Sequence, residues 1–360
     1  MNIVVTGSIA YDYLMTFPGR FADYILPDQL DRISLSFLVD EMRRQRGGCA
    51  ANIAYNLALL GERPRVMATA GQDFGELGSE YGYRQWLEQQ GVDTSLIRDE
   101  PDLFTASFFV NTDQDGHQIA SFYTGAMARA RQLSFHDLET DEIDLAVISP
   151  NDPQAMVKYA AECQELGIPY LYDPSQQIIR LAGQHLREGL EGCSLLVVND
   201  YEFELLREKT GLSAEAIRYT PSRACVVTLG AEGARIWAGG NVYDIPAVPP
   251  RRTEDPTGIG DAFRAGLIKG LALGLSWELA GRMGALAATY ALEQTGPQSH
   301  RYTLTDFVTR FREHFDDDQA LDVLLYRQAQ SSKFKAQSSK VQPPTSNFQL
   351  PTSNQGSDSL

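Results

Sequence analysis

The sequence contains few cysteines and few histidines, and neither residue type is clustered. The four cysteines form no Cys-x-x-Cys pair, so we expect buried, reduced thiols and not a disulfide scaffold. The five histidines lie apart from one another and form no His-Glu-x-x-His motif, which argues against a dedicated zinc cage. A chain of 360 residues can bury roughly three quarters of its unfolded surface. Its core therefore needs no disulfides.

Positive charge is also scarce. The chain carries 31 Lys and Arg against 47 Asp and Glu, a formal net charge of −16. This balance argues against nucleic acid and against an anionic membrane surface as partners. It does not exclude ATP. At short range, backbone amides, arginine and Mg²⁺ attract the ATP phosphates more strongly than distant negative charges on the protein repel them. The chain has no bilayer-length apolar run and no basic region before its first apolar stretch, so we expect a cytoplasmic protein.

Three common nucleotide-binding patterns are missing as well. No Gly-x-x-x-x-Gly-Lys-Ser/Thr occurs, which excludes a P-loop enzyme, and the His-Arg-Asp and Asp-Phe-Gly set of protein kinases is absent. No Gly-x-Gly-x-x-Gly follows the first apolar strand, which counts against a dinucleotide-dependent dehydrogenase. The phosphate-binding candidate that remains is the turn from Gly258 to Asp261.

This turn joins two glycines to the start of an expected helix. Gly258 and Gly260 flank Ile259, Asp261 follows at once, and an amphipathic pattern runs from Ala262 to about Leu273. A helix N-terminus has unpaired N–H groups and a partial positive charge, so it attracts phosphate. An acidic residue in a first helical turn is also ordinary capping chemistry. Glycine on both sides favours a ligand site, because no side chain blocks a close approach, and Asp261 then becomes a candidate general base.

The fold class follows from the alternation of short apolar strands with helical patterns. This alternation predicts an α/β protein with a doubly wound, mostly parallel sheet flanked by helices. We expect a small β-sheet lid from about 13–45 and 104–124, which contains a strand at Ser34–Val39 and a hairpin around Asp113–Gly116. Strands are predicted at Asn2–Thr6, Val66–Ala70, Thr105–Asn111, His117–Tyr123, Leu145–Ile148, Pro169–Tyr172, Leu195–Val198 and Cys225–Leu229; helices are predicted at Ala50–Leu60, Gly78–Gln90, Pro153–Leu166, Tyr201–Lys209, Ala262–Leu273, Ser276–Leu292 and Leu304–His314.

The composition changes near residue 328. From there Gln, Ser, Lys, Pro, Thr and Asn dominate, and such a segment buries too little apolar surface to offset the entropy of ordering. We therefore predict one domain over residues 1–327 and a disordered polar tail over residues 328–360.

A second glycine motif lies near the N-terminus. Gly47 and Gly48 precede an expected helix whose first turn carries Asn52. Together with the 255–266 stretch, this motif resembles the two signatures of the ribokinase-like (PfkB) carbohydrate and nucleoside kinases. The resemblance runs from Met1 to about Phe315 and is strongest to bacterial adenosine kinases. It implies a ribokinase-like fold and transfer of the ATP γ-phosphoryl group to the adenosine 5′-hydroxyl, which yields AMP for purine salvage.

The resemblance also assigns roles to individual residues. Asp261 is the implied base, and the backbone of Gly258, Ile259 and Gly260 stabilises the transferring phosphoryl group. ATP is implied to contact Asn199, Thr228, Gly230 and Gly233, and Glu202 to hold Mg²⁺ through water. The expected substrate-binding residues are Ser8, Asp12, Ser36, Gly48, Asn52, Phe108, Phe122, Gln176, Gln177 and Arg180. Arg180 is expected to meet phosphate, although an exposed arginine is also often simply solvated.

Several alternatives stay open. Asn199 and Glu202 also fit a helix N-cap with a glutamate at N3, and Phe108 and Phe122 also fit a core. A ribokinase-type sugar kinase and a non-catalytic nucleoside-binding sensor are the alternative functions. The family resemblance suggests a homodimer formed through the lid, and the sequence leaves activation by K⁺ open.

Overall fold

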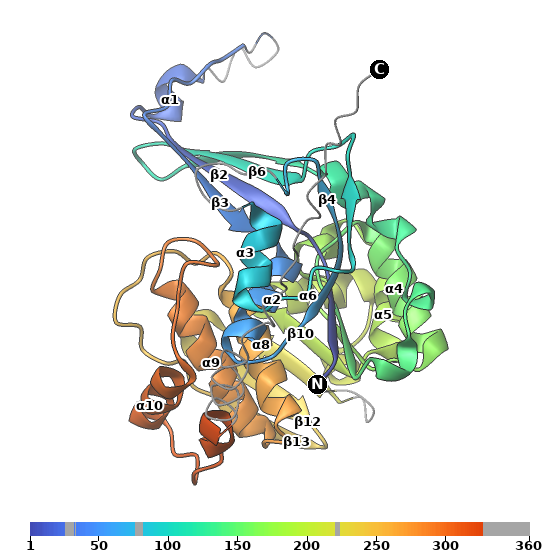
Figure 1. The fold of residues 1–360 in the computed structure, drawn as a ribbon. Coiled ribbons are helices and arrows are strands. Elements are labelled where there is room, and N and C mark those ends of the chain that lie inside the picture. The colour runs from blue at the N-terminus through green and yellow to red at the C-terminus, as the bar shows by residue number, and fades with distance from the viewer. Residues whose placement is uncertain (26–31, 33, 76–81, 220–223, 327–360) are drawn as a thin grey trace, which may run out of the picture.

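A sheet of nine strands forms the centre of the computed structural model (Figure 1). The structure describes residues 1–25, 32, 34–75, 82–219 and 224–326. The strand order is β13-β12-β11-β10-β9-β8-β1-β4-β5, with all pairs parallel from β11 to β5. The strands are β1 (Ile3–Thr6), β4 (Arg65–Gly71), β5 (Ile97–Glu100), β8 (Leu145–Ile148), β9 (Tyr170–Tyr172), β10 (Leu195–Asn199), β11 (Ala224–Thr228), β12 (Ala234–Ala238) and β13 (Asn241–Ile245). The predicted doubly wound sheet is confirmed, and the antiparallel strands β12 and β13 extend it beyond the prediction.

Helices cover both faces of this sheet. Alternate strand residues point to opposite faces, so Val5 packs in one core cluster and Val4 in the other. Val5 shares its core with α2 (Cys49–Leu59), α3 (Tyr83–Gln90), α8 (Ile259–Ala272), α9 (Trp277–Leu292) and α10 (Leu304–His314). Val4 shares its core with α4 (Pro153–Leu166), α5 (Gly183–Gly192), α6 (Asp200–Thr210) and α7 (Ala214–Arg218). In Figure 1 the orange helices α8 and α9 and the green helices α4 and α5 lie on opposite sides.

A second, smaller sheet forms the predicted lid. Its four strands, in the order β3-β2-β6-β7, are β2 (Ala10–Thr16), β3 (Glu41–Gly47), β6 (Ala106–Thr112) and β7 (Gln118–Tyr123). The β6–β7 hairpin is confirmed. Because β2 follows β1 after three residues, the lid projects from the carboxyl end of β1 (Figure 1).

The strand predicted at Ser34–Val39 is wrong. Residues 34–39 have no regular structure, and the lid strand in this part of the chain is β3, which begins at Glu41 and pairs with one edge of β2. The apolar pattern has another cause. Phe37 packs against Phe21 and Tyr24 of α1 (Phe21–Tyr24) and against Phe17, which precedes this helix. Strand β3 is largely exposed and polar, so no apolar alternation marks it.

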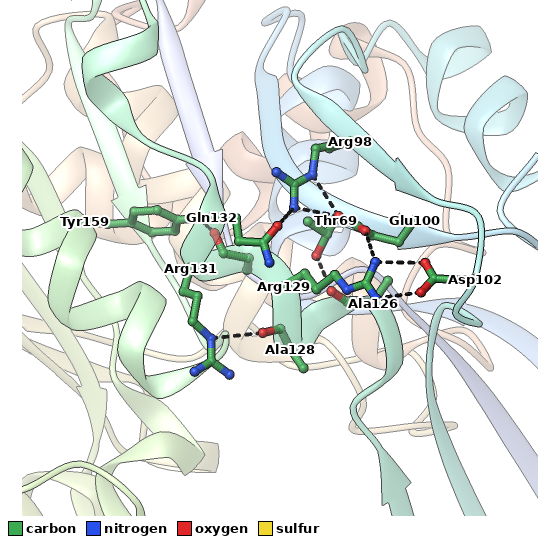
Figure 2. Close-up of polar contacts among 11 residues, drawn as sticks. Thr69, Arg98, Glu100, Asp102, Ala126, Ala128, Arg129, Arg131, Gln132 and Tyr159 are labelled. Atoms are coloured by element: carbon green, nitrogen blue, oxygen red, sulfur yellow. Dashed lines mark hydrogen bonds and ion pairs between the residues drawn. The ribbon is translucent and has the colours of Figure 1, made fainter.

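Charged side chains anchor the base of the lid (Figure 2). Arg129, in the 3-10 helix η2 (Gly125–Gln132) that follows β7, donates to Glu100 at 2.7 Å and to both carboxylate oxygens of Asp102 at 2.8 and 2.6 Å. Arg98 donates to the other oxygen of Glu100 at 2.7 Å. The segments that enter and leave the lid hairpin are thereby joined to the edge strand β5.

Two predicted segments lie in parts of the chain that the structure does not describe, and one prediction concerns the membrane. The predicted polar tail, residues 328–360, and the start of the predicted 78–90 helix lie outside the described residues. Within the described part of the chain, no helix has the length and apolar character needed to cross a bilayer.

Candidate active site

The two glycine motifs meet in space. Gly48 has φ 96° and precedes α2, while Gly258 has φ 80° and precedes α8. Asn52, in the first turn of α2, donates its Nδ2 to Asp261 Oδ2 at 2.9 Å, across 209 residues of sequence. Ser8 accepts a hydrogen bond from the Cys49 N–H at 3.0 Å and so satisfies one free donor at the start of α2. The fold therefore assembles one site from both ends of the chain.

The missing side chains at the second turn have a packing reason. A Cβ at Gly258 would lie 2.6 Å from Pro297 Cβ, and a Cβ at Gly260 would lie 2.6 Å from Arg264 Nη1. The sequence pattern predicts that ligand atoms use this space; in the structure, protein atoms already approach both positions. At Gly258 the close contact with Pro297 and the left-handed φ of 80° both favour glycine, whatever binds in front of the turn, whereas at Gly260 the neighbouring atom is the end of the Arg264 side chain.

A cavity of about 870 Å³ opens in front of the turn. It lies at the carboxyl ends of β9, β10 and β11, where α/β sheets bind ligands. Every residue predicted to contact ATP lines this cavity, together with the catalytic turn and one predicted nucleoside residue. These lining residues are Gln176, Asn199, Glu202, Thr228, Gly230, Gly233, Gly258, Ile259, Gly260 and Asp261.

Three predicted nucleoside residues lie in one row across the lid. Asp12 is directly opposite Phe108, and Phe108 is directly opposite Phe122, so the three side chains share a face of the sheet. Burial, together with the nearby carboxylates of Asp255 and Asp261, raises the pKa of Asp12 to about 6. This face of the lid is therefore turned toward Asp261. Phe122 is 42% exposed and Phe108 is half-buried, so neither is a fully buried core residue.

Three other predicted residues differ in their exposure to solvent. Ser36 is exposed in the irregular segment before β3. Gln177 is buried in the 3-10 helix η5 (Ser175–Ile179), and its Oε1 has no hydrogen-bond partner among the described residues. Arg180 is exposed directly after η5.

Asp261 has the properties of a base at neutral pH. Its side chain is half-buried, and burial raises its pKa to about 6, against the lowering effects of Arg264 and of the hydrogen bond from Asn52. A pKa of about 6 leaves most molecules ionised at pH 7 and keeps the carboxylate more basic than an exposed aspartate.

Asn199 and Glu202 form the helix cap that was the alternative interpretation. Asn199 Oδ1 accepts the Glu202 N–H at 2.7 Å, and Glu202 Oε2 accepts the Asn199 N–H at 2.8 Å. Glu202 Oε1 also accepts a hydrogen bond from Ser175 Oγ at 2.8 Å. Ser175 has φ 37°, which is uncommon for a residue other than glycine and marks local strain beside the cavity. Carboxylate oxygens accept more than one partner, so the cap leaves Glu202 able to face water on a metal ion.

Sequence reasoning missed two charged residues of the cavity wall, Arg264 and Asp173. They form a buried ion pair at 2.5 Å. Each had a detectable signature, because Arg264 is a charged residue in a largely apolar helix, three residues after Asp261, and Asp173 follows a strand directly. Gln298 was also missed; it donates to Asn52 Oδ1 at 2.9 Å, and nothing in the sequence marks it.

A helix N-terminus at a glycine turn, a carboxylate beside it and a covering sheet define the class of an α/β phosphotransferase with a lid. The profile of the pfkB family carbohydrate kinases matches residues 5–303, and the chain belongs to this family. Members of this family are ATP-dependent phosphotransferases that act on hydroxyl groups, and this chain is one of them.

Known proteins of similar sequence and structure include several nucleoside kinases. The structure of Burkholderia thailandensis nucleoside kinase in complex with inosine is 38% identical, covers 87% of this chain and 98% of its own, and has a TM-score of 0.76. The Methanocaldococcus jannaschii nucleoside kinase structure is 25% identical over 87% of this chain and 99% of its own, also with a TM-score of 0.76. The Methanothermobacter thermautotrophicus nucleoside kinase is 29% identical over 86% of this chain and 95% of its own sequence. The ribokinase-like fold is thereby confirmed.

Proposed function

We propose that this kinase is a nucleoside kinase that transfers the γ-phosphoryl group of ATP to the 5′-hydroxyl of adenosine and so yields AMP. The observation that carries the proposal is the position of Asp261. Its carboxylate borders the cavity lined by the predicted ATP residues and also lies near Asp12 on the inner face of the lid. The similarity to nucleoside kinases, one of them solved with inosine, supports a nucleoside as the acceptor.

In this proposal Asp261 accepts the proton of the attacking hydroxyl. A positioned base typically contributes ~10²–10⁴-fold to the rate. The backbone N–H groups from Gly258 to Asp261 stabilise charge on the transferred phosphoryl oxygens, and each such donor is worth roughly 3–4 kcal/mol at most. Phosphoryl transfer depends chiefly on positioning and electrostatics, so these groups suffice without a covalent intermediate.

The lid selects the acceptor. Asp12 is suited to accept hydrogen bonds from two vicinal ribose hydroxyls, because an ionised carboxylate is an acceptor with two oxygens. Phe108 and Phe122, on the same face, supply flat apolar surface against which a purine base packs. A plain sugar has no such ring to pack there. Water is excluded when the lid lies over the acceptor, which limits hydrolysis of ATP.

The donor set of the cavity fits Mg²⁺. Asp173, Asp200, Glu202 and Asp261 line it, and Mg²⁺ prefers oxygen ligands and retains several waters. Glu202 would hold the ion through water, and the bound ion would neutralise charge on the ATP phosphates.

A substrate panel tests the proposal. The purified protein is assayed with Mg-ATP and adenosine, inosine, cytidine, ribose or fructose, with Asp261→Asn as the matched inactive control. We expect the highest kcat/KM with adenosine, followed by inosine. A preference for ribose or fructose would make the protein a sugar kinase. Tight adenosine binding by calorimetry without any phosphorylation would make it a nucleoside sensor.

A further inference from the structure

Gln298 lies behind the contact between the two glycine motifs. It is 5% exposed, and its Nε2 donates to Asn52 Oδ1 at 2.9 Å and to the Tyr83 hydroxyl oxygen at 2.5 Å. The Tyr83 hydroxyl donates in turn to the Gly47 carbonyl at 2.8 Å. At the other end, Asn52 Nδ2 donates to Asp261 Oδ2 at 2.9 Å. A continuous row of hydrogen bonds therefore runs from the N-terminal glycine motif to the carboxylate of Asp261.

Chemistry fixes the direction of each bond in this row. A tyrosine hydroxyl has one hydrogen, and that of Tyr83 goes to the Gly47 carbonyl, which can only accept. Burial raises the pKa of Tyr83, so the hydroxyl keeps this hydrogen. Its oxygen must then accept, and the group of Gln298 that faces it must be the NH2 group. The same NH2 group faces Asn52, which presents its Oδ1 there and turns its own NH2 group toward Asp261.

The reversed orientation of the Asn52 amide would lose both of its contacts. Its oxygen would face the Asp261 carboxylate, and its NH2 group would face the NH2 group of Gln298, so acceptor would oppose acceptor and donor would oppose donor. Asn52 is only 4% exposed, so water does not readily satisfy the groups left unpaired. The Oε1 of Gln298 has no partner among the described residues, so its NH2 contacts are what hold this amide.

The backbone next to Gln298 also contacts the turn that carries the catalytic carboxylate. The Gly296 N–H donates to Asp255 Oδ2 at 2.9 Å, and a Cβ at Gly258 would lie 2.6 Å from Pro297 Cβ. Residues 296–298 thus lie against both glycine motifs. The side chain of Gln298 therefore projects from a segment that the same site holds in place.

We propose that Gln298 is a positioning residue of the transfer reaction: it orients the Asn52 amide so that the NH2 group, and not the oxygen, faces Asp261. Gln298 is not among the described residues that line the cavity, so it acts through Asn52 and not by contact with the substrates. This inference rests on the proposed function, in which Asp261 is the base. A reversed Asn52 would repel the carboxylate and move it away from the attacking hydroxyl.

The test removes the donor and follows both the rate and the amide. Gln298→Met keeps the approximate size of the side chain but donates nothing, so kcat at pH 7, with Mg-ATP and the best acceptor of the substrate panel, should fall about 2- to 10-fold. In protein labelled with ¹⁵N-asparagine, the side-chain NH2 signal that Asn52→Leu abolishes should shift. Should Gln298→Met not fold, Gln298→Glu is the second variant: its carboxylate accepts where the amide donates, and should draw the Asn52 NH2 group away from Asp261.

A double-mutant cycle separates positioning from a general loss of stability. With Asn52→Leu present no amide is left to orient, so adding Gln298→Met should change kcat by less than about twofold. The inference is overturned if the two falls in kcat multiply in the double variant, or if the Asn52 signal stays in place in Gln298→Met. A failure of the proposed function looks different: Asp261→Asn would keep its kcat, while Gln298→Met would still shift the Asn52 signal.

Gln164→Met is the matched control. Gln164, on α4, likewise donates to a tyrosine hydroxyl, that of Tyr170 at 3.0 Å, which donates to the Gly189 carbonyl at 2.8 Å. It is not among the described residues that line the cavity. This variant should lose stability and leave both kcat and the Asn52 signal unchanged. An equal fall in kcat in this control would count against the inference, because the effect would then not depend on Asn52.

Discussion

The contact between the two motifs makes a quantitative prediction. Replacing Asn52 by leucine, which has a similar size, removes the 2.9 Å hydrogen bond that Asp261 accepts from Nδ2. Gln298 loses its acceptor on Asn52 but keeps the Tyr83 hydroxyl at 2.5 Å, so local damage is limited. The main expected consequence is a carboxylate at position 261 with one stabilising donor fewer.

The size of the effect follows from the strength of that bond. A hydrogen bond to a charged group contributes about 1.5–3 kcal/mol, and one pKa unit corresponds to about 1.36 kcal/mol. The pKa of Asp261, about 6 in the structure, should therefore rise to roughly 7–8. The ionised fraction at pH 7 falls accordingly, so kcat at pH 7 should drop roughly 2- to 15-fold and recover above about pH 9.

The assay is the pH profile of kcat with saturating ATP and nucleoside. Asn56→Leu is the matched control, because Asn56 is a buried asparagine one turn farther along α2 that bonds to the Asn52 carbonyl and to His300. A fall in kcat that is equal at every pH would refute the reasoning, since the change would then not act through ionisation of Asp261. The same shift in the Asn56 variant would refute it as well.

Four further outcomes are expected. Asp261→Asn should lower kcat by about 10²-fold or more. It should also raise the free energy of unfolding at pH 7 by roughly 1–3 kcal/mol, because a carboxyl whose pKa is raised to about 6 is charged there at a cost. This gain should vanish below about pH 3.8, where the folded and unfolded states are both protonated; denaturant titrations at the two pH values check it, and an equal gain at both would contradict it. Asp12→Asn should raise the nucleoside KM roughly tenfold with little change for ATP, and unchanged nucleoside affinity by calorimetry would remove Asp12 from the site. Gly258→Ala should cost roughly 1–3 kcal/mol in thermal unfolding, because of φ 80° and the contact with Pro297; an unchanged Tm would contradict this. Glu100→Gln should speed hydrogen exchange in residues 101–105, because Arg98 and Arg129 lose their shared carboxylate; unchanged exchange would mean that this cluster does not stabilise the base of the lid.

Local chemistry explains which elements the sequence predicts correctly. The β6–β7 hairpin has a clear turn between two strands, and α4 begins at Pro153 after the capping residue Asp152. Buried parallel strands such as β8 read as short apolar runs. Strand β3 is not predicted in this way, because it is an exposed polar edge strand. Its position is set by its register with β2 and not by an apolar pattern in its own sequence.

The sequence by itself determined the family, the parallel sheet, the lid hairpin and the glycine turn with Asp261, since each depends on residues close together along the chain. Only the tertiary structure decided that Asn52 bonds to Asp261, that Arg264 pairs with Asp173 and that Asp12 shares a lid face with Phe108 and Phe122. These contacts join residues many tens of positions apart. Their distances, and the burial that raises the pKa of Asp261, depend on how whole layers pack, which no local pattern specifies.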